Sequence, residues 1–349
     1  MTSSGDSSPS SQPWRMALVA GAVLLVAAGC GGDSSTATPS TAADTPTTLA
    51  GAAEVAGVGT FAVGKRNEEL VDESRPTDAW GGQEELPERT LPTLVLYPAE
   101  GDPDEEAIAP DAAPADGRWP VVVFSHGRGG NGPAYTSTLR LLASAGYVVV
   151  VPTYPLTSSD TPERPKTADL ANQPADVSFL LDWVTSLPGT DPLADSVDPE
   201  RLGLAGHSLG AFTSLAAAYN PAHLDDRVDA VAEWAGAYVG RLSDGGDAVQ
   251  DGPPLLAVHG DDDDTVPYAA APATVKEVGE PWWLVTLVGG GHIPPYVQGL
   301  NDPYSTVVSM TTLDFFDATL KDDDAGYDRI AETVTEAGPQ VATLESATE

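Results

Sequence analysis

The fold is decided by the stretch R-L-G-L-A-G-H-S-L-G at residues 201–210. Residues 201–205 read as a short strand and residues 209–219 as an alanine-rich helix, so a G-x-S-x-G pattern occupies the turn between them. At such a turn the serine adopts a strained backbone conformation that exposes its hydroxyl, and the two glycines let strand and helix approach closely. Ser208 is therefore the candidate nucleophile. The alternative interpretation is a Gly/Ser turn that only begins a helix.

Outward from this turn, short apolar runs alternate with segments of helical period, which is typical of α/β proteins. The run Y-V-V-V-V at 147–151 is apolar throughout, as in a parallel strand covered on both faces. Strands are predicted at 90–97, 120–124, 147–151, 201–205, 228–234, 254–259 and 282–288, and helices at 133–145, 174–187, 209–219, 268–278 and 303–320. Surface loops rich in Pro, Gly or Asp are expected at 102–118, 153–173 and 238–252. The order predicts a mostly parallel central sheet flanked by helices.

Composition excludes several classes of function. The 349 residues include 52 Asp and Glu against 16 Lys and Arg, a formal net charge of −36, and they show no cationic stripe for a nucleic-acid backbone. An apolar fraction of 41% suffices for a sizeable core, which argues against a disordered acidic chain. A single cysteine permits neither an internal disulfide nor a soft-metal site. We expect no nucleic acid, no metal and no cofactor.

The N-terminus predicts export. Residues 16–28 form an apolar run that is shorter than the roughly 20 residues of a membrane span but suits a signal peptide, predicted over 1–29. The run ends in A-A-G-C, which resembles a bacterial lipobox and implies that Cys30 is lipidated, with a flexible Ser/Thr/Pro-rich tether over 30–55. We expect a lipoprotein on the outer face of the bacterial cytoplasmic membrane, in contact with lipid through this anchor only. The alternative is an ordinary cleaved signal and a secreted protein.

Four motifs together resemble those of the α/β-hydrolase superfamily. They are F-S-H-G-R-G-G at 124–130, G-H-S-L-G at 206–210, H-G-D-D-D-D-T-V-P at 259–267 and G-G-G-H at 289–292. Within the superfamily, the chain is similar to the dienelactone-hydrolase-like, chlorophyllase-like and platelet-activating-factor-acetylhydrolase-like serine esterases, over about residues 90–320. The resemblance implies an α/β-hydrolase fold over 56–335, without a large cap domain, and a C-terminal tail over 336–349.

The resemblance also implies a catalytic triad. A serine hydroxyl needs a base beside it and a carboxylate that orients the base, and in this superfamily both follow the serine in the order acid, then histidine. The H-G-x-x-D spacing places the acid at Asp263. Asp264, one residue further on, and Glu233, near the end of the strand over 228–234, are alternatives. The base is expected at His292, the one histidine that follows this acid.

The same resemblance predicts where the oxyanion of a tetrahedral intermediate would bind. The donors are the backbone N–H groups of Leu209, which follows the nucleophile, and of Arg128 in the glycine-rich loop. These features imply a carboxylic-ester hydrolase of the esterase or lipase type that forms an acyl-enzyme on Ser208. Without a cap the site is expected to be open, which suits bulky or polymeric esters, and the protein is expected to be a monomer. Two alternatives remain: a cell-envelope acyltransferase with the same triad, and a non-catalytic binding protein with this fold.

Overall fold

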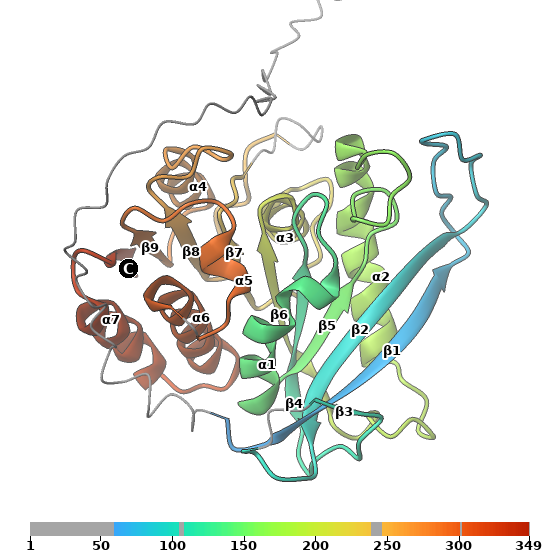
Figure 1. Cartoon of the computed structure of the whole chain (residues 1–349), viewed down its shortest axis with the longest axis horizontal. Coiled ribbons are helices and arrows are strands. Elements are labelled where there is room, and N and C mark those ends of the chain that lie inside the picture. Colours follow the sequence, from blue (N-terminus) through green and yellow to red (C-terminus); the bar gives the residue numbers. More distant parts are fainter. Residues whose placement is uncertain (1–58, 105–107, 239–245, 301, 349) are drawn as a thin grey trace, which may run out of the picture. The chain divides into compact units, whose positions relative to one another are not determined.

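The structure, a computed structural model, describes residues 59–104, 108–238, 246–300 and 302–348. These residues form one β-sheet with helices packed against it. By internal contacts the chain divides into two units, Met1–Pro46 and Thr47–Glu349, and every described residue belongs to the second. Within these residues, ten strands pair in the order β10-β9-β8-β7-β6-β4-β5-β2-β1-β3 (Figure 1).

The centre of the sheet is parallel and its margins are largely antiparallel. Strands β4 to β9 pair in parallel with their neighbours, whereas β2 runs antiparallel to β1 and β5, and β10 runs antiparallel to β9. The strands are β1 (Ala62–Asp72), β2 (Arg89–Ala99), β3 (Ala109–Pro110), β4 (Trp119–Ser125), β5 (Val148–Pro152), β6 (Val197–His207), β7 (Ala230–Trp234), β8 (Leu255–Gly260), β9 (Trp282–Leu287) and β10 (Ala342–Ala347). The predicted mostly parallel sheet is confirmed.

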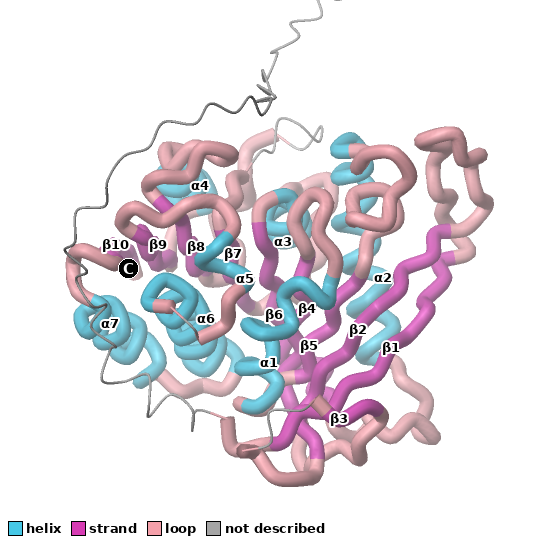
Figure 2. The backbone as a smooth tube through the Cα atoms, in the orientation of Figure 1, coloured by secondary structure: helices cyan, strands magenta, loops and turns pink. Residues whose placement is uncertain are grey.

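Helices cover both faces of this sheet (Figure 2). On one face lie α1 (Thr136–Ser144), α5 (Pro294–Val297), α6 (Pro303–Leu320) and α7 (Ala325–Ala337); on the other lie α2 (Gln173–Thr185), α3 (Leu209–Tyr219) and α4 (Ala270–Val278). Short 3₁₀ helices occupy Gly132–Tyr135 and Thr167–Asn172. No cap domain interrupts the described residues, and the α/β-hydrolase architecture expected from the sequence is confirmed.

The apolar run of β5 shows why the sheet is covered twice. Side chains of a strand alternate between its two faces, so Val149 and Val151 pack in the core under α1 and α6, while Val148 and Val150 pack in the core under α2 and α3. All of these valines are fully buried. A strand with apolar residues on both faces can only be stable between two layers of helices, which gives the three-layer arrangement.

Several sequence-based boundaries are wrong. The C-terminal tail expected over 336–349 begins inside α7 and contains β10, whose Ala342 is buried against β9. The loop expected over 102–118 contains β3, and the loop over 153–173 contains a 3₁₀ helix. Strand β1 and helices α5 and α7 were not predicted. The missed strands are short or, like β1, rich in charged residues, so they lack the apolar run that marks a central strand.

Some predictions fall outside the described residues. The signal peptide, Cys30 and the tether to residue 55 lie there, as do residues 239–245 of the loop expected over 238–252. In the described part of the chain, none of the helices is both long enough and apolar enough to span a lipid bilayer.

Candidate active site

The candidate nucleophile lies at the turn between β6 and α3. Ser208 has φ 54° and ψ −120°, a region that residues with a side chain rarely adopt. Its backbone N–H donates to the carbonyl oxygen of Trp234 at 2.8 Å, which ties the turn to the neighbouring strand β7. A Cβ atom on Gly206 would collide with the backbone of Gly210, and one on Gly210 would collide with the carbonyl of Ser125. The two motif glycines therefore allow the close approach that holds the serine in this conformation.

The structure brings His292 and Asp263 to this serine from two other loops. His292 Nε2 lies 2.8 Å from Ser208 Oγ, and His292 Nδ1 lies 2.6 Å from Asp263 Oδ2. These residues follow β9 and β8, and because the carboxyl ends of parallel strands meet at one edge of a sheet, the loops converge there. The serine hydroxyl, the imidazole and the carboxylate form a continuous hydrogen-bonded chain, the arrangement that activates a serine as a nucleophile.

The carboxylate of Asp263 is held in its charged form. Burial alone would raise the pKa of Asp263, but bonds from His259 and His292 and from two backbone N–H groups lower it well below its usual range. Those N–H groups belong to Thr265 and Val266, each 2.8 Å from Asp263 Oδ1. An ionised Asp263 requires the proton of His292 to sit on Nδ1, which leaves the lone pair of Nε2 facing the serine hydroxyl.

Neither alternative acid reaches His292. The side chain of Asp264 is exposed, and its Oδ1 accepts from Thr265 Oγ1 at 3.3 Å. Glu233 is fully buried, and its Oε2 accepts the backbone N–H of Gly236 at 2.7 Å. Burial raises the pKa of Glu233 to about 7. Since both imidazole nitrogens of His292 already have partners, Asp263 takes the position of the acid.

The glycine-rich loop after β4 lies against the nucleophile. A Cβ atom on Gly127 would come within 3.3 Å of Ser208 Cβ. The carbonyl oxygen of Gly127 accepts from Gly130 N–H at 2.9 Å and from His126 Nδ1 at 2.8 Å. Because C=O and N–H point in opposite directions across a trans peptide, these bonds aim the N–H of Arg128 away from them. Sequence reasoning missed this role of His126, whose burial lowers its pKa to about 4 and so favours the neutral ring.

Both backbone N–H groups expected to bind the oxyanion are free to donate to a ligand. In the described part of the chain, neither Arg128 N–H nor Leu209 N–H donates to another protein group. Leu209 is the first residue of α3, where the N–H groups of a helix lack internal acceptors and the helix dipole favours negative charge. An oxyanion that forms next to Ser208 would accept from these N–H groups and would be stabilised by the helix dipole.

The long loop after β5 supports the glycine-rich loop. Gly129 N–H donates to the carbonyl of Thr157 at 2.7 Å, and Ser159 N–H donates to the carbonyl of Gly130 at 2.9 Å. Thr157 Oγ1 in turn accepts from Gln173 Nε2 of α2 at 2.7 Å. This contact pattern was not predicted, because the pairing of two loops leaves no periodic signal in the sequence.

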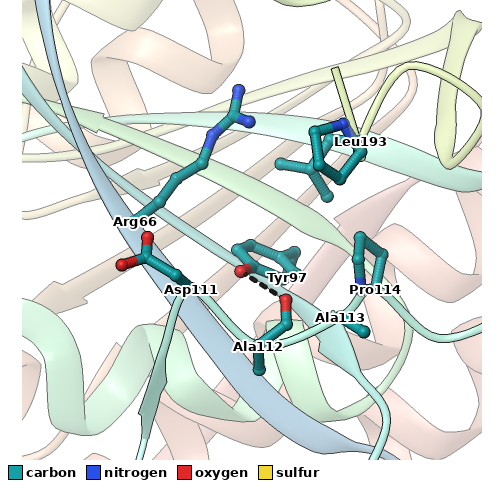
Figure 3. A pocket seen from close by; sticks show the side chains of 8 residues that line it. Arg66, Tyr97, Asp111, Ala112, Ala113, Pro114 and Leu193 are labelled. Atoms are coloured by element: carbon teal, nitrogen blue, oxygen red, sulfur yellow. Dashed lines mark hydrogen bonds between the residues drawn. The ribbon is translucent and has the colours of Figure 1, made fainter. Parts of the chain in front are cut away.

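A separate cavity of about 340 Å³ lies beside β1 and β2, and no residue of the triad lines it (Figure 3). The guanidinium of Arg66 borders it but already pairs with Glu68 and Asp191. The hydroxyl of Tyr97 donates to the carbonyl of Ala112 at 2.9 Å, as the dashed line in Figure 3 shows. This cavity offers no pair of nucleophile and base.

Comparisons with known proteins find similarity in part of the sequence and in the fold. Residues 107–232 match the model of the Chlorophyllase family, a span that includes the glycine-rich loop and Ser208 but ends before Asp263 and His292. Among solved structures, a ferulic acid esterase from Streptomyces cinnamoneus shares the fold, with a TM-score of 0.59 and 21% sequence identity over 75% of this chain and 91% of that chain. The chain accordingly shares the fold of this esterase and resembles the Chlorophyllase family over residues 107–232.

Proposed function

We propose that this chain is an exported carboxylic-ester hydrolase that forms an acyl-enzyme on Ser208. The observation that carries the proposal is the 2.8 Å contact between Ser208 Oγ and His292 Nε2, with Asp263 2.6 Å behind the imidazole. A protein that only binds a ligand has no physical need for a strained serine, a base and an ionised carboxylate in one hydrogen-bonded chain.

In the first half of the reaction, His292 Nε2 takes the proton of Ser208 as Oγ attacks the ester carbonyl. The carbonyl oxygen becomes negatively charged and accepts hydrogen bonds from the N–H groups of Arg128 and Leu209. Asp263 stabilises the imidazolium that forms. When the tetrahedral intermediate collapses, the C–O bond of the ester breaks, the leaving alcohol takes the proton from His292, and the acyl group stays on Ser208.

The second half of the reaction repeats these steps with water. His292 removes a proton from a water molecule, whose oxygen attacks the acyl carbon, and the same two N–H groups hold the second oxyanion. Collapse returns the proton to Ser208 Oγ and releases the carboxylic acid. If an alcohol or sugar replaced water, the same steps would give acyl transfer, so product analysis with competing alcohols distinguishes the two reactions.

We infer that the substrate is a bulky ester with an apolar portion. Ile293 follows the catalytic base directly and is 56% exposed, which places an apolar side chain at the rim beside His292. Exposed apolar groups at a site favour contact with an apolar ligand. The structurally similar esterase acts on ferulic acid esters by its name. An aromatic ester such as methyl ferulate is therefore a suitable probe next to aliphatic esters of graded chain length.

The decisive test compares the purified full-length protein with its Ser208→Ala variant on nitrophenyl esters of graded acyl length. We expect Ser208→Ala to lose at least about 10³-fold in kcat, because no other group can form the acyl-enzyme. Ser346→Ala, which changes an exposed serine on β10, is the matched control and should keep full activity. Equal activity of Ser208→Ala and wild type would refute the proposed nucleophile.

Export and lipidation rest on the leader sequence alone. The apolar run at 16–28 and the A-A-G-C sequence that ends at Cys30 support a lipid anchor. In a bacterial host fed with labelled palmitate, the wild type should carry the label and fractionate with membranes, and Cys30→Ala should do neither. A label that persists in Cys30→Ala would contradict lipidation at this residue.

A further inference from the structure

Tyr135 and His207 connect two loops of the active site that lie far apart in the sequence. The backbone N–H of Gly127 donates to Tyr135 Oη at 3.2 Å, and Tyr135 Oη lies 2.8 Å from His207 Nδ1. His207 Nε2 lies 2.7 Å from the backbone carbonyl oxygen of His292. These three contacts, which we name the Tyr135–His207 bridge, join the loop of the oxyanion donor to the loop of the catalytic base.

The protons in this bridge have one consistent arrangement. A carbonyl oxygen can only accept, so Nε2 of His207 must carry the hydrogen that it donates to His292. Burial, and secondarily the neighbouring His292, lower the pKa of His207 to about 3, so the ring is neutral and Nδ1 is an acceptor. Tyr135 then donates its hydroxyl hydrogen to Nδ1 and accepts from Gly127 N–H with an oxygen lone pair. Every donor has an acceptor.

The bridge is also tightly packed. Tyr135 is 4% exposed and His207 is 3% exposed. The ring of His207 lies 4.8 Å from that of Tyr296 and 5.0 Å from that of His292, measured between centroids. A Cβ atom on Gly127 would come within 3.1 Å of His207 Nδ1, so a larger residue there would push the glycine-rich loop away. Neither ring can turn without displacing its neighbours.

We propose that Tyr135 and His207 are positioning residues for ester hydrolysis, which set the oxyanion donor of Arg128 and the imidazole of His292 in register with Ser208. This inference rests on the proposed function. His207 precedes the nucleophile and holds the backbone of His292, so the base is tied to the nucleophile turn. Tyr135 holds Gly127 N–H, so the next peptide, which carries Arg128 N–H, stays fixed. Displacement of catalytic groups by about 1 Å can lower a rate about 100-fold.

The first test compares two Tyr→Phe variants with the same chemical change. Tyr135→Phe removes only the hydroxyl of the bridge. Tyr219→Phe is the matched control, because Tyr219 is 1% exposed and its hydroxyl donates to the carbonyl of Pro253 at 2.7 Å, outside the site. We expect Tyr135→Phe to lower kcat about 10- to 100-fold with KM within about twofold, and Tyr219→Phe to keep kcat. Equal kcat values for the two variants would overturn the inference.

A second readout separates positioning from a structural role. A thionoester has sulfur in place of the carbonyl oxygen, and sulfur is a weak acceptor, so the ratio of kcat/KM for ester over thionoester reports on the oxyanion donors. We expect this ratio to fall in Tyr135→Phe and to stay at the wild-type value in Tyr219→Phe. A loss of stability alone would lower both rates equally, and an unchanged ratio would contradict the bridge.

A third readout tests whether the two residues act as one unit. His207→Phe should lower kcat, and adding Tyr135→Phe to it should lower kcat little further, since the bridge is already broken. Additive losses would overturn the coupling. Nitrogen NMR of wild-type His207 should show a neutral ring with the hydrogen on Nε2, and a hydrogen on Nδ1 would overturn the arrangement. An inert wild type overturns the proposed function, whereas an active wild type with unaffected Tyr135→Phe overturns this inference alone.

Discussion

Two clusters of polar and charged side chains in this molecule differ in how completely their atoms are paired. The arginine cluster comprises Arg89, Asp169 and Asp176, all 0% exposed. Its guanidinium makes two bonds of 2.7 Å to one carboxylate and bonds of 2.8 and 3.1 Å to the other. The catalytic cluster comprises Ser208, Asp263 and His292 with the two residues behind them, His259 and Glu233. There Glu233 Oε1 and His259 Nδ1 have no hydrogen-bond partner.

The difference shows which buried charges hold a fold and which perform chemistry. In the arginine cluster, burial alone would lower the pKa of Arg89, but bonds to both aspartates raise it, so the cation is permanent and each of its three nitrogens has a carboxylate partner. In the catalytic cluster, Glu233 and Asp263 have pKa values shifted in opposite directions within one connected group. Carboxyl groups pushed apart in pKa near a reachable hydroxyl are typical of active sites.

The strongest test of this contrast is Asp263→Asn. The amide keeps the shape of the carboxylate but favours the wrong imidazole tautomer, so we expect kcat to fall by about 10⁴-fold with the fold intact. Asp264→Asn is the matched control, because this exposed neighbour does not touch His292. Kinetics on a nitrophenyl ester and a thermal unfolding curve for each variant provide the measurement. A larger loss in Asp264→Asn than in Asp263→Asn would reassign the acid.

The sequence predicts the centre of the fold better than its margins, for a physical reason. Central strands such as β5 are apolar on both faces, and α3 follows the G-x-S-x-G turn, so local pattern and burial agree. Strand β1 has charged residues at consecutive positions and so on both faces, and β10 has a single buried position, Ala342. Their stability comes from pairing with β2 and β9, which is information about partners far away in the sequence.

The residues of the candidate site also differ in how well the sequence predicts them. Ser208 carries a local motif, and His292 stands out by chain order, so both can be proposed from sequence. The choice among Asp263, Asp264 and Glu233 depends on the conformation of a loop, because adjacent aspartates differ only in the direction in which their side chains point. The contacts of His126, His207 and Tyr135 leave no sequence signal, since hydrogen bonds between buried side chains depend on the tertiary fold.

A substitution in the arginine cluster should lower the stability of the protein, whereas a substitution in the catalytic cluster should lower the rate of catalysis. Arg89→Met leaves Asp169 and Asp176 buried beside an apolar side chain, and breaking a buried ion pair in this way costs about 3–5 kcal/mol. Burial, the largest influence, already raises the pKa of Asp176 even with Arg89 present. We expect the free energy of unfolding, measured with denaturant, to fall by that amount, while kcat per folded molecule stays within about twofold of the wild-type value. A normal stability with lost activity would reverse the assignment of the two clusters.

The pH dependence of stability tests the role of Glu233, whose Oε1 has no hydrogen-bond partner. Its pKa of about 7 in the folded state exceeds the ordinary value of 4.5, so between these pH values the folded state retains a proton that the unfolded state has lost. Stability from this group is present below pH 4.5 and is lost as the pH rises through 7. From pH 5 to pH 8, unfolding free energy should fall by about 2–3 kcal/mol more in the wild type than in Glu233→Gln.

The control for this pH effect is the neighbouring His259, which also titrates. Its ring lies 3.4 Å from Asp263 through Nε2 and responds electrostatically to Glu233. His259→Gln in the Glu233→Gln background removes the coupled pair, so the slope that remains comes from other buried groups such as His126 and His207, whose pKa values burial lowers. Parallel stability profiles for wild type and Glu233→Gln between pH 5 and pH 8 would contradict a raised pKa for Glu233.

Arg75→Met should have the smallest effect and refines the arginine cluster. Arg75 also contacts Asp176, at 2.7 Å, but its side chain is 24% exposed, and it pairs with Asp72 at the same distance. Its removal leaves Asp176 still bonded to Arg89, so no buried charge loses its last partner. We expect a loss of about 1 kcal/mol or less, as for solvent-accessible ion pairs, and weaker still at high salt. Equal destabilisation by Arg75→Met and Arg89→Met would show that the exposure of the arginine does not set the cost of its removal. The number of aspartates that each arginine contacts would then have to explain that cost.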